Sequence, residues 1–380
     1  MPNYSFTKKT SLFPMPANTP EPGPYYTCLV SMHDLEGFPF DYALYFSPDH
    51  HRGEGGIWLY VCNGDPTNPA NYMSYEDAVA AGHFDHIGEK PAANPIHLDN
   101  VQGTGHTETP HANIVNGVVH LTYHKNGIER TQRTMLATST DGVNFNRLNG
   151  DVDSVVLTYD VETDVGDGHT GYFRWSTNPF PGISLKYVGY SLHGGGDDYH
   201  SAIWASDDAI SWERLDILTP IEGFAVDRED MILIWHEIDP ASIRRLDSGE
   251  FVAIAGVGNR ASGGVERTTE LYEIYLAEDG RTLTHQSRRI LPTGAGDAPD
   301  TEELSSPTSI VIDGVVNLIY VGAAQGGTVN TVLGATGTLD PALLPSRLLD
   351  KTDRTRHIYN PGSQNGAAHP ARRSRSQRRE

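Results

Sequence analysis

Two stretches of the chain decide its fold: PHANIVNGVVHLTYH at residues 110–124 and PTSIVIDGVVNLIYV at residues 307–321. They share a proline, a glycine, a Val-Val pair, a leucine and a tyrosine in one register. Each is typical of a strand, an Asn-Gly or Asp-Gly turn and a second strand, because these turn residues tolerate the positive φ of a tight hairpin. Two copies this far apart indicate a repeated β-hairpin unit.

Weaker copies extend this repeat over most of the chain. They lie around Gly56, Gly194 and Gly249, in GEGGIWLYVC, ISLKYVGYSLHGG and LDSGEFVAIAGVG. Helical periodicity is nearly absent, and successive copies lie roughly 60–70 residues apart. The pattern predicts a single-domain, all-β propeller of about five blades over residues 27–345. A two-sheet sandwich is the alternative, but it would not predict this repeat. Residues 1–26 are expected to be an extended segment, and residues 346–380 an extension with a basic, disordered end.

A short acidic turn follows some of these hairpins. STDGVNF at residues 139–145 matches SDDAISW at residues 206–212, and AEDG at residues 277–280 is a looser copy. The shared pattern is S-x-D-x-x-x-aromatic, and it resembles the Asp-box turn of sialidase-like and other glycosidase propellers. We expect the Asp side chain to accept hydrogen bonds from its own turn while the aromatic ring packs beneath it. The turn is therefore assigned a structural role and no catalytic one.

Composition excludes several classes of partner. The formal net charge of -21 at pH 7 disfavours binding to nucleic acid or to an anionic membrane surface. No apolar run is long enough to span a membrane. The first residues lack the apolar core of a secretory signal, so we expect a cytoplasmic protein, or a secreted or periplasmic one if a leader has been removed. Cys28 and Cys62 lie in apolar strands and are interpreted as core residues, with a disulfide as the alternative. The oligomeric state is left open.

Departures from the repeat point to a functional site. Where the copy at 307–321 and its flank have Ser305, Thr308 and Val321, the earlier copy has Glu108, His111 and His124. A structural repeat requires neither a carboxylate nor imidazoles at these places. Since the innermost strands of a propeller converge on its axis, we expect Glu108 or His111 to line the axial mouth.

Other polar residues stand near the expected starts of inner strands. Asp41 precedes an apolar strand in the first repeat, and FAVDREDMILIWHE places Glu229 before a strand in the fourth. The remaining candidates come from GDGHTGYFRW and SLHGGGDDYH of the third repeat: His169, Tyr172, Arg174, Trp175 and His193. The aromatic residues Tyr172 and Trp175 could stack on sugar faces or pack between blades. Asp41, Glu108, His111, His169 and Arg174 are predicted to converge at one mouth.

This arrangement resembles the five-bladed propeller glycosidases, namely the arabinanase, xylosidase and invertase-like enzymes. Asp41 resembles the catalytic Asp that starts an inner strand of their first blade. Glu108, in ETP, resembles their Glu before Pro on a later blade, and Asp227-Arg228-Glu229 loosely resembles a further acidic element. The sequence departs from these families in lacking a clear Asp-Pro after the first acid and in having a His-rich mouth. The resemblance implies a carbohydrate-active enzyme acting on an oligo- or polysaccharide.

A glycoside hydrolase needs two carboxyl groups, one protonated and one ionised. We assign Asp41 as base, Glu108 or Glu229 as acid, and His169 or Arg174 as a sugar-binding group; His111 and His193 are further substrate-binding candidates. The first alternative is a polysaccharide lyase with His169 or Tyr172 in acid–base roles and Arg174 neutralising a uronate. The second is a non-catalytic sugar-binding propeller. No cofactor is required; a divalent cation held by His106 or His124 is a weak alternative.

Overall fold

The structure of the chain is a computed structural model. It describes residues 4–9, 13, 23–48, 55–99, 107–128, 131–148, 155–158, 169–195, 198–218, 231–259, 268–324 and 329–339. These residues belong to one compact unit, Met1–Leu344, and they are mostly β-strands. Within the described ranges the helices are the short α1 (Tyr75–Ala80) and a 3₁₀ turn, η2 (Pro69–Asn71). The extension expected over residues 346–380 lies outside these ranges.

The strands form antiparallel sheets in which neighbours in space are mostly neighbours in sequence. One sheet holds β2 (Pro24–Ser31), β3 (Tyr42–Pro48), β4 (Trp58–Cys62) and β5 (Tyr72–Ser74). A second holds β14 (Met231–Arg245), β15 (Phe251–Asn259), β16 (Thr268–Leu276) and β17 (Arg288–Leu291). A third holds β18 (Glu303–Ile312), β19 (Val315–Ala324), β20 (Val329–Leu339) and β1 (Tyr4–Lys8).

The largest sheet is made of two antiparallel groups. One contains β6 (Thr107–Val115), β7 (Val118–Ile128), β8 (Thr131–Ser139) and β9 (Asn146–Arg147). The other contains β10 (His169–Thr177), β11 (Tyr187–Gly195), β12 (Asp198–Ser206) and β13 (Glu213–Leu218). They are joined only where β10 runs parallel to β8 for two residues, His169 opposite Gln132 and Thr170 opposite Arg133.

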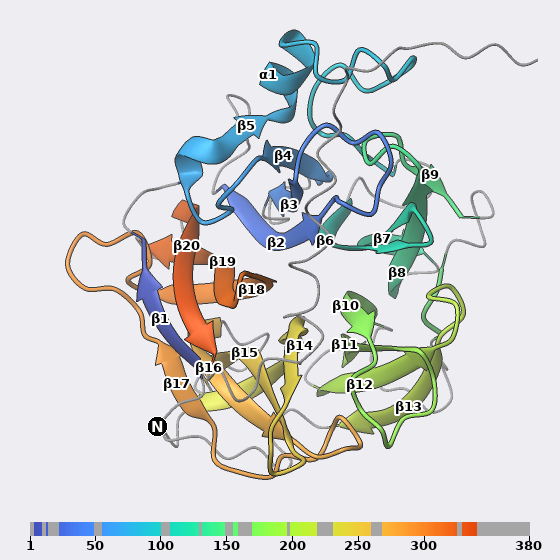
Figure 1. Cartoon of the computed structure of the whole chain (residues 1–380). Coiled ribbons are helices and arrows are strands. Elements are labelled where there is room, and N and C mark those ends of the chain that lie inside the picture. The colour runs from blue at the N-terminus through green and yellow to red at the C-terminus, as the bar shows by residue number, and fades with distance from the viewer. Residues whose placement is uncertain are drawn as a thin grey trace, which may run out of the picture. The chain divides into compact units, whose positions relative to one another are not determined.

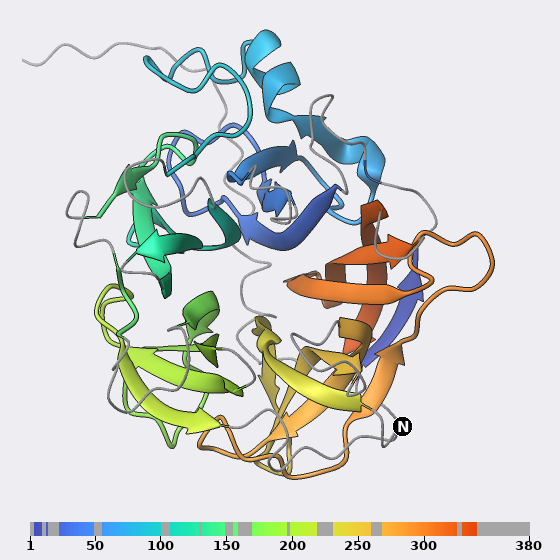
Figure 2. The same ribbon diagram turned by 180° about the vertical axis from the view of Figure 1, so that it is seen from behind.

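The first strands of these groups surround a common centre. β2 contacts β6, β6 contacts β10, β10 contacts β14, β14 contacts β18, and β18 contacts β2 again. In Figure 1 the sheets radiate outward from these strands, and the view from behind in Figure 2 shows the same arrangement. Radial packing of this kind is typical of β-propellers, because it leaves only short sheet edges exposed.

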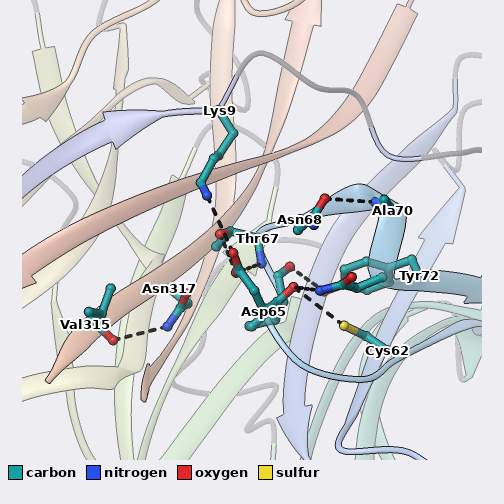
Figure 3. A network of polar contacts seen from close by, with 11 residues as sticks. Lys9, Cys62, Asp65, Thr67, Asn68, Ala70, Tyr72, Val315 and Asn317 are labelled. Atoms are coloured by element: carbon teal, nitrogen blue, oxygen red, sulfur yellow. Dashed lines mark hydrogen bonds and ion pairs between the residues drawn. The ribbon is translucent and has the colours of Figure 1, made fainter. Parts of the chain in front are cut away.

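The N-terminal strand completes the last sheet. β1 pairs antiparallel with β20, from Tyr4 opposite Leu339 to Lys8 opposite Ala335. Just beyond β1, the Lys9 ammonium lies 3.6 Å from the Asp65 carboxylate in the turn after β4 (Figure 3). The segment expected only to be extended therefore joins the two ends of the sheet ring, and β2 already begins at Pro24.

The repeat predicts Gly56, Gly117, Gly249 and Gly314 at equivalent hairpin turns, and three of these four glycines lie there. Gly117, Gly249 and Gly314 each lie between the first and second strands of a group, with φ of 76°, 94° and 79°. The prediction for Gly56 is wrong. This glycine lies in the connection from β3 to β4, the second and third strands of its sheet, and not between the first and second strands. Its backbone N–H donates to the Thr107 carbonyl of the neighbouring sheet.

Apolar side chains from facing sheets form the core. Strands such as β3 and β4 are buried on both faces, as expected for sheets packed against neighbours on either side. Cys28 and Cys62 are buried free thiols, which confirms their interpretation as core residues. No helix in the described part of the chain is long and apolar enough to cross a membrane.

The two closest copies of the acidic turn have the hydrogen bonds expected of them. Asp141 Oδ1 accepts from the backbone N–H groups of Val143 and Asn144 at 3.0 and 2.8 Å. Asp208 Oδ1 accepts from Ile210 and Ser211 at 2.8 and 2.7 Å. Burial alone would raise the pKa of both carboxyl groups, but these hydrogen bonds outweigh it and the pKa of each is lowered.

Replacing the turn carboxylate should therefore cost stability without touching the centre of the ring. We expect Asp141→Ala to lower the free energy of unfolding by about 1 kcal/mol, since it removes side-chain-to-backbone hydrogen bonds. Because the folded-state pKa of Asp141 is depressed, its charge contributes fully above the unfolded-state pKa of about 3.9. This contribution is lost progressively as the pH falls from there through the lower folded-state pKa. Urea unfolding at pH 7 and pH 3 measures both effects; an equal loss at the two pH values would contradict the assignment.

Candidate active site

The first strand of each antiparallel group has an irregularity in its pairing with the second strand. The pairing register shifts between Tyr25 and Cys28, Glu108 and His111, Gly171 and Arg174, Leu233 and Ile238, and Ser305 and Thr308. Four non-glycine residues in these irregularities have positive φ: Tyr26 (50°), Thr109 (52°), Tyr172 (55°) and Ser306 (51°). Such backbone is strained, and a bulge re-aims the side chains beside it. Strain repeated around one centre favours a functional site there.

A pocket lies at these irregularities. Its lining side chains come from β2, β6, β10, β14 and β18: Tyr26, Thr27, Thr109, Pro110, Tyr172, Arg174, Glu237 and Ser306. The rings of Tyr26 and Tyr172 meet edge to face with centroids 5.2 Å apart. The pocket therefore combines an aromatic wall with hydroxyl, carboxyl and guanidinium groups.

Two buried carboxyl groups of β14 lie at or beside the pocket. Glu237 Oε2 accepts a 2.6 Å hydrogen bond from the Ser306 N–H, and Asp239 Oδ2 accepts one of 2.5 Å from the Ser309 hydroxyl. Burial raises the pKa of Glu237 above its usual value and that of Asp239 to about 6, against the opposing effect of Arg174. A raised pKa favours the protonated form of a carboxyl group, which can donate its proton.

Arg174 is the positive charge of the pocket lining. Its side chain is 8% exposed, and Nη2 donates to the Thr27 carbonyl at 3.2 Å. Its charge lowers the pKa of the Glu237 and Asp239 carboxyl groups, which places the guanidinium within electrostatic reach of both. Arg174, one of the residues predicted for the axial mouth, is thus a lining residue of this pocket.

Further polar groups surround the pocket. Glu108 Oε1 lies 3.0 Å from His124 Nδ1, and the His124 ring lies 5.0 Å from that of Tyr172. On another side, Glu303 Oε1 accepts a 2.7 Å hydrogen bond from the Tyr25 hydroxyl. Glu108 immediately precedes the lining residue Thr109, so the structure places it beside the pocket and pairs it with an imidazole.

His111 and Trp175 pack between sheets. His111 Nε2 lies 2.6 Å from the Trp175 carbonyl oxygen, which makes this nitrogen the donor, and Nδ1 lies 3.6 Å from the Cys28 thiol. Burial and the nearby Arg174 lower the pKa of His111 to about 3, so its ring is neutral. Trp175 is 1% exposed and its ring packs against those of Tyr187 and Trp212. Trp175 therefore packs between sheets here, which is one of its two predicted roles, and its ring is not exposed for stacking on a sugar.

Asp41 and His193 lie elsewhere. The expectation that Asp41 directly precedes an inner strand is wrong: it precedes β3, the second strand of its sheet. There its Oδ2 accepts from the Gly64 N–H at 2.9 Å and its own N–H donates to Asn63 at 2.9 Å. His193 is a buried residue of β11 and its Nε2 lies 3.1 Å from Arg214 Nη1. Neither residue lines the pocket.

The side chains of three predicted site residues fall outside the described part of the structure. Glu229 and His106 belong to undescribed segments, and of His169 only the backbone, the first residue of β10, is described. Among the described residues, no group of three or more His, Cys, Asp or Glu side chains gathers closely enough to hold a metal ion. His124, one of the two metal candidates, lies against Glu108 instead.

Sequence reasoning missed several lining residues. The lining residue Glu237, and Asp239 beside the pocket, were available as polar interruptions of the apolar strand MILIWHEID. Thr109-Pro110 and Ser306-Pro307 occupy matching places in the two clearest repeats, and both pairs fall within the register shifts. Shared Ser/Thr-Pro pairs on inner strands were therefore a usable signal for the pocket.

Comparisons with known proteins find a similar architecture among solved structures only. No protein-family model and no curated protein matches the chain. Among solved structures, a glycoside hydrolase superposes with a TM-score of 0.56 at 12% identity, covering 87% of this chain and 92% of the other. A structure from a family of mannoside phosphorylases that contains glycoside hydrolases targeting β-1,2 mannosidic linkages gives 0.55 at 12% identity, over 87% and 93% of the chains.

An N-acetylgalactosamine deacetylase from F. plautii, in complex with blood group B trisaccharide, gives a TM-score of 0.51 at 11% identity, over 89% and 96% of the chains. At such identities the likeness shows the fold alone. Together with the sheet order, it establishes a propeller-type all-β fold, in agreement with the sequence prediction of fold class.

Proposed function

We propose that the protein is a glycoside hydrolase built on a five-bladed propeller and active at the central pocket. The observation that carries this proposal is Glu237, a buried carboxyl group with a raised pKa in a pocket lined by five strands. The blade count is supported by the ring of contacting first strands, in which the two halves of the largest sheet count as separate blades. The two acidic turns with matching hydrogen bonds support Asp-box-like turns.

In this proposal Glu237 is the general acid. It protonates the leaving oxygen of the glycosidic bond, while an ionised carboxylate across the pocket acts as base or nucleophile. Glu108 and Glu303 are the candidates for that second role. Glu108 directly precedes the lining residue Thr109, and Glu303 accepts a hydrogen bond from Tyr25, the chain neighbour of the lining residue Tyr26. The Tyr26 and Tyr172 rings offer the flat surfaces on which sugar rings pack.

A polysaccharide lyase is the second candidate, and Arg174 favours it. A guanidinium in the pocket could neutralise the carboxylate of an acidic sugar and so ease removal of the neighbouring proton. Tyr26 fits the acid role better than the base role in such a step, because burial raises its pKa well above the usual value.

Incubation with a panel of polysaccharides distinguishes these activities. Hydrolysis gives new reducing ends alone, whereas elimination also gives products that absorb ultraviolet light. We expect reducing ends without absorbing products. Absorbing products would replace the hydrolase by the lyase, and binding without cleavage of any substrate would favour a sugar-binding propeller.

A further inference from the structure

One edge of the Arg174 guanidinium is held by the protein and the other is not. Nη2 donates to the Thr27 carbonyl, but the buried Nη1 has no hydrogen-bond partner among the described residues. Buried donors of charged groups are nearly always paired, since leaving one without an acceptor is costly. A guanidinium that lines a pocket with a free donor is therefore prepared for an acceptor from a ligand.

Two hydroxyl groups of the pocket share this property. Thr109 Oγ1 and Ser306 Oγ are buried and have no hydrogen-bond partner among the described residues. Their backbones are fixed: the Thr109 N–H donates to Ser47 Oγ at 3.1 Å and the Ser306 N–H to Glu237. Both residues have positive φ in the bulges that form the pocket. Three donors on three different strands thus line one small space.

We propose that this pocket binds the carboxylate of an acidic sugar, a uronic acid residue of the substrate. The inference rests on the proposed function and specifies its substrate class. Arg174 Nη1 supplies a charge-assisted hydrogen bond to the carboxylate, and the hydroxyls of Thr109 and Ser306 donate to it or to adjacent sugar hydroxyls.

The charge around Arg174 favours a singly charged ligand. The buried carboxyl groups of Glu237 and Asp239 lie within electrostatic reach of this guanidinium, which lowers the pKa of each while burial raises it. A uronate carries one charge, whereas inorganic phosphate near neutral pH carries up to two and would be repelled more strongly.

Calorimetric titration of the whole protein tests the proposal. The probes are glucuronate and galacturonate, each against its neutral parent sugar, with inorganic phosphate as a separate arm. We expect each uronate to bind about tenfold or more tightly than the neutral sugar. Equal affinity for uronate and neutral sugar, the absence of uronate binding, or tighter binding of phosphate than of uronate would overturn the proposal.

Variants assign the preference to the pocket. Arg174→Gln should abolish the preference for uronate. Arg174→Lys keeps the positive charge but loses the planar guanidinium with its paired N–H donors, so it should retain part of the preference. Ser306→Ala provides a milder test in case Arg174→Gln does not fold, and should weaken uronate binding several-fold. The matched control Lys186→Gln removes an exposed positive charge outside the pocket and should leave the preference unchanged. A preference that survives in Arg174→Gln, or unchanged uronate affinity in Ser306→Ala, would overturn the assignment.

Failure of this inference differs from failure of the proposed function. Hydrolysis of a neutral polysaccharide without any uronate preference would overturn the inference and leave the hydrolase in place. Uronate binding that depends on Arg174, without cleavage of any polysaccharide, would support the inference and remove the hydrolase.

Discussion

Glu237→Gln should lower the turnover of a confirmed substrate by roughly 10²–10⁴ while leaving the protein folded. Glutamine keeps the shape of the side chain and can still accept the Ser306 N–H, but it cannot donate a proton to the leaving group. Because burial already disfavours the ionised form of Glu237, the neutral amide should cost little stability. Steady-state kinetics together with a urea midpoint separate the two effects.

Asp41→Asn is the comparison that decides between the two candidate positions of the active site, because Asp41 is the base that the sequence suggested. Asp41 accepts a hydrogen bond from the Gly64 N–H in a turn away from the pocket lining, so asparagine there should leave turnover within about twofold. A large loss of rate in Asp41→Asn, with Glu237→Gln fully active, would return the active site to the position that the sequence suggested.

The fold was predictable because its signals are local. Asn116-Gly117 and Asp313-Gly314 both adopt positive φ between paired strands, which is what this turn chemistry requires. The same two repeats carry Pro110 and Pro307, and both prolines fall inside a register shift of the first strand. The conformation of a hairpin turn depends on a few adjacent residues, so the repeat could be recognised without knowledge of its packing.

The candidate site was less predictable because it depends on which strand is innermost. β2 and β3 are similarly apolar, and periodicity gives no distance from the axis, so Asp41 was placed before the wrong strand. On β14 the apolar residues at 231–234 indicated the strand start, but the strand continues to Arg245 with two register shifts. The pocket residue Glu237 lies within the first of these shifts. Long-range packing determines both which strand is innermost and how far β14 extends, and neither can be derived from local sequence.

Asp99→Asn should lower the free energy of unfolding by about 3–5 kcal/mol, because it leaves two buried cations without their counterion. The Asp99 carboxylate lies 3.0 Å from Lys125 Nζ and 3.0 Å from Arg147 Nε, and it accepts a 2.7 Å hydrogen bond from the Tyr123 hydroxyl. The side chains of Lys125 and Asp99 are both 0% exposed. Burial already lowers the pKa of Lys125, an effect that Asp99 opposes. Urea denaturation at pH 7 measures the loss.

The matched control is the exposed ion pair between Lys9 and Asp65, whose side chains are 35% and 44% exposed. Lys9→Gln should cost at most about 1 kcal/mol, since water screens the charges and Asp65 keeps its hydrogen bonds to Thr67. Adding Lys125→Met to Asp99→Asn should recover part of the loss, because it removes one of the uncompensated buried charges. If Asp99→Asn costs no more than Lys9→Gln, the buried cluster does not hold the region before β6 against β7 and β9 in the way that its geometry implies.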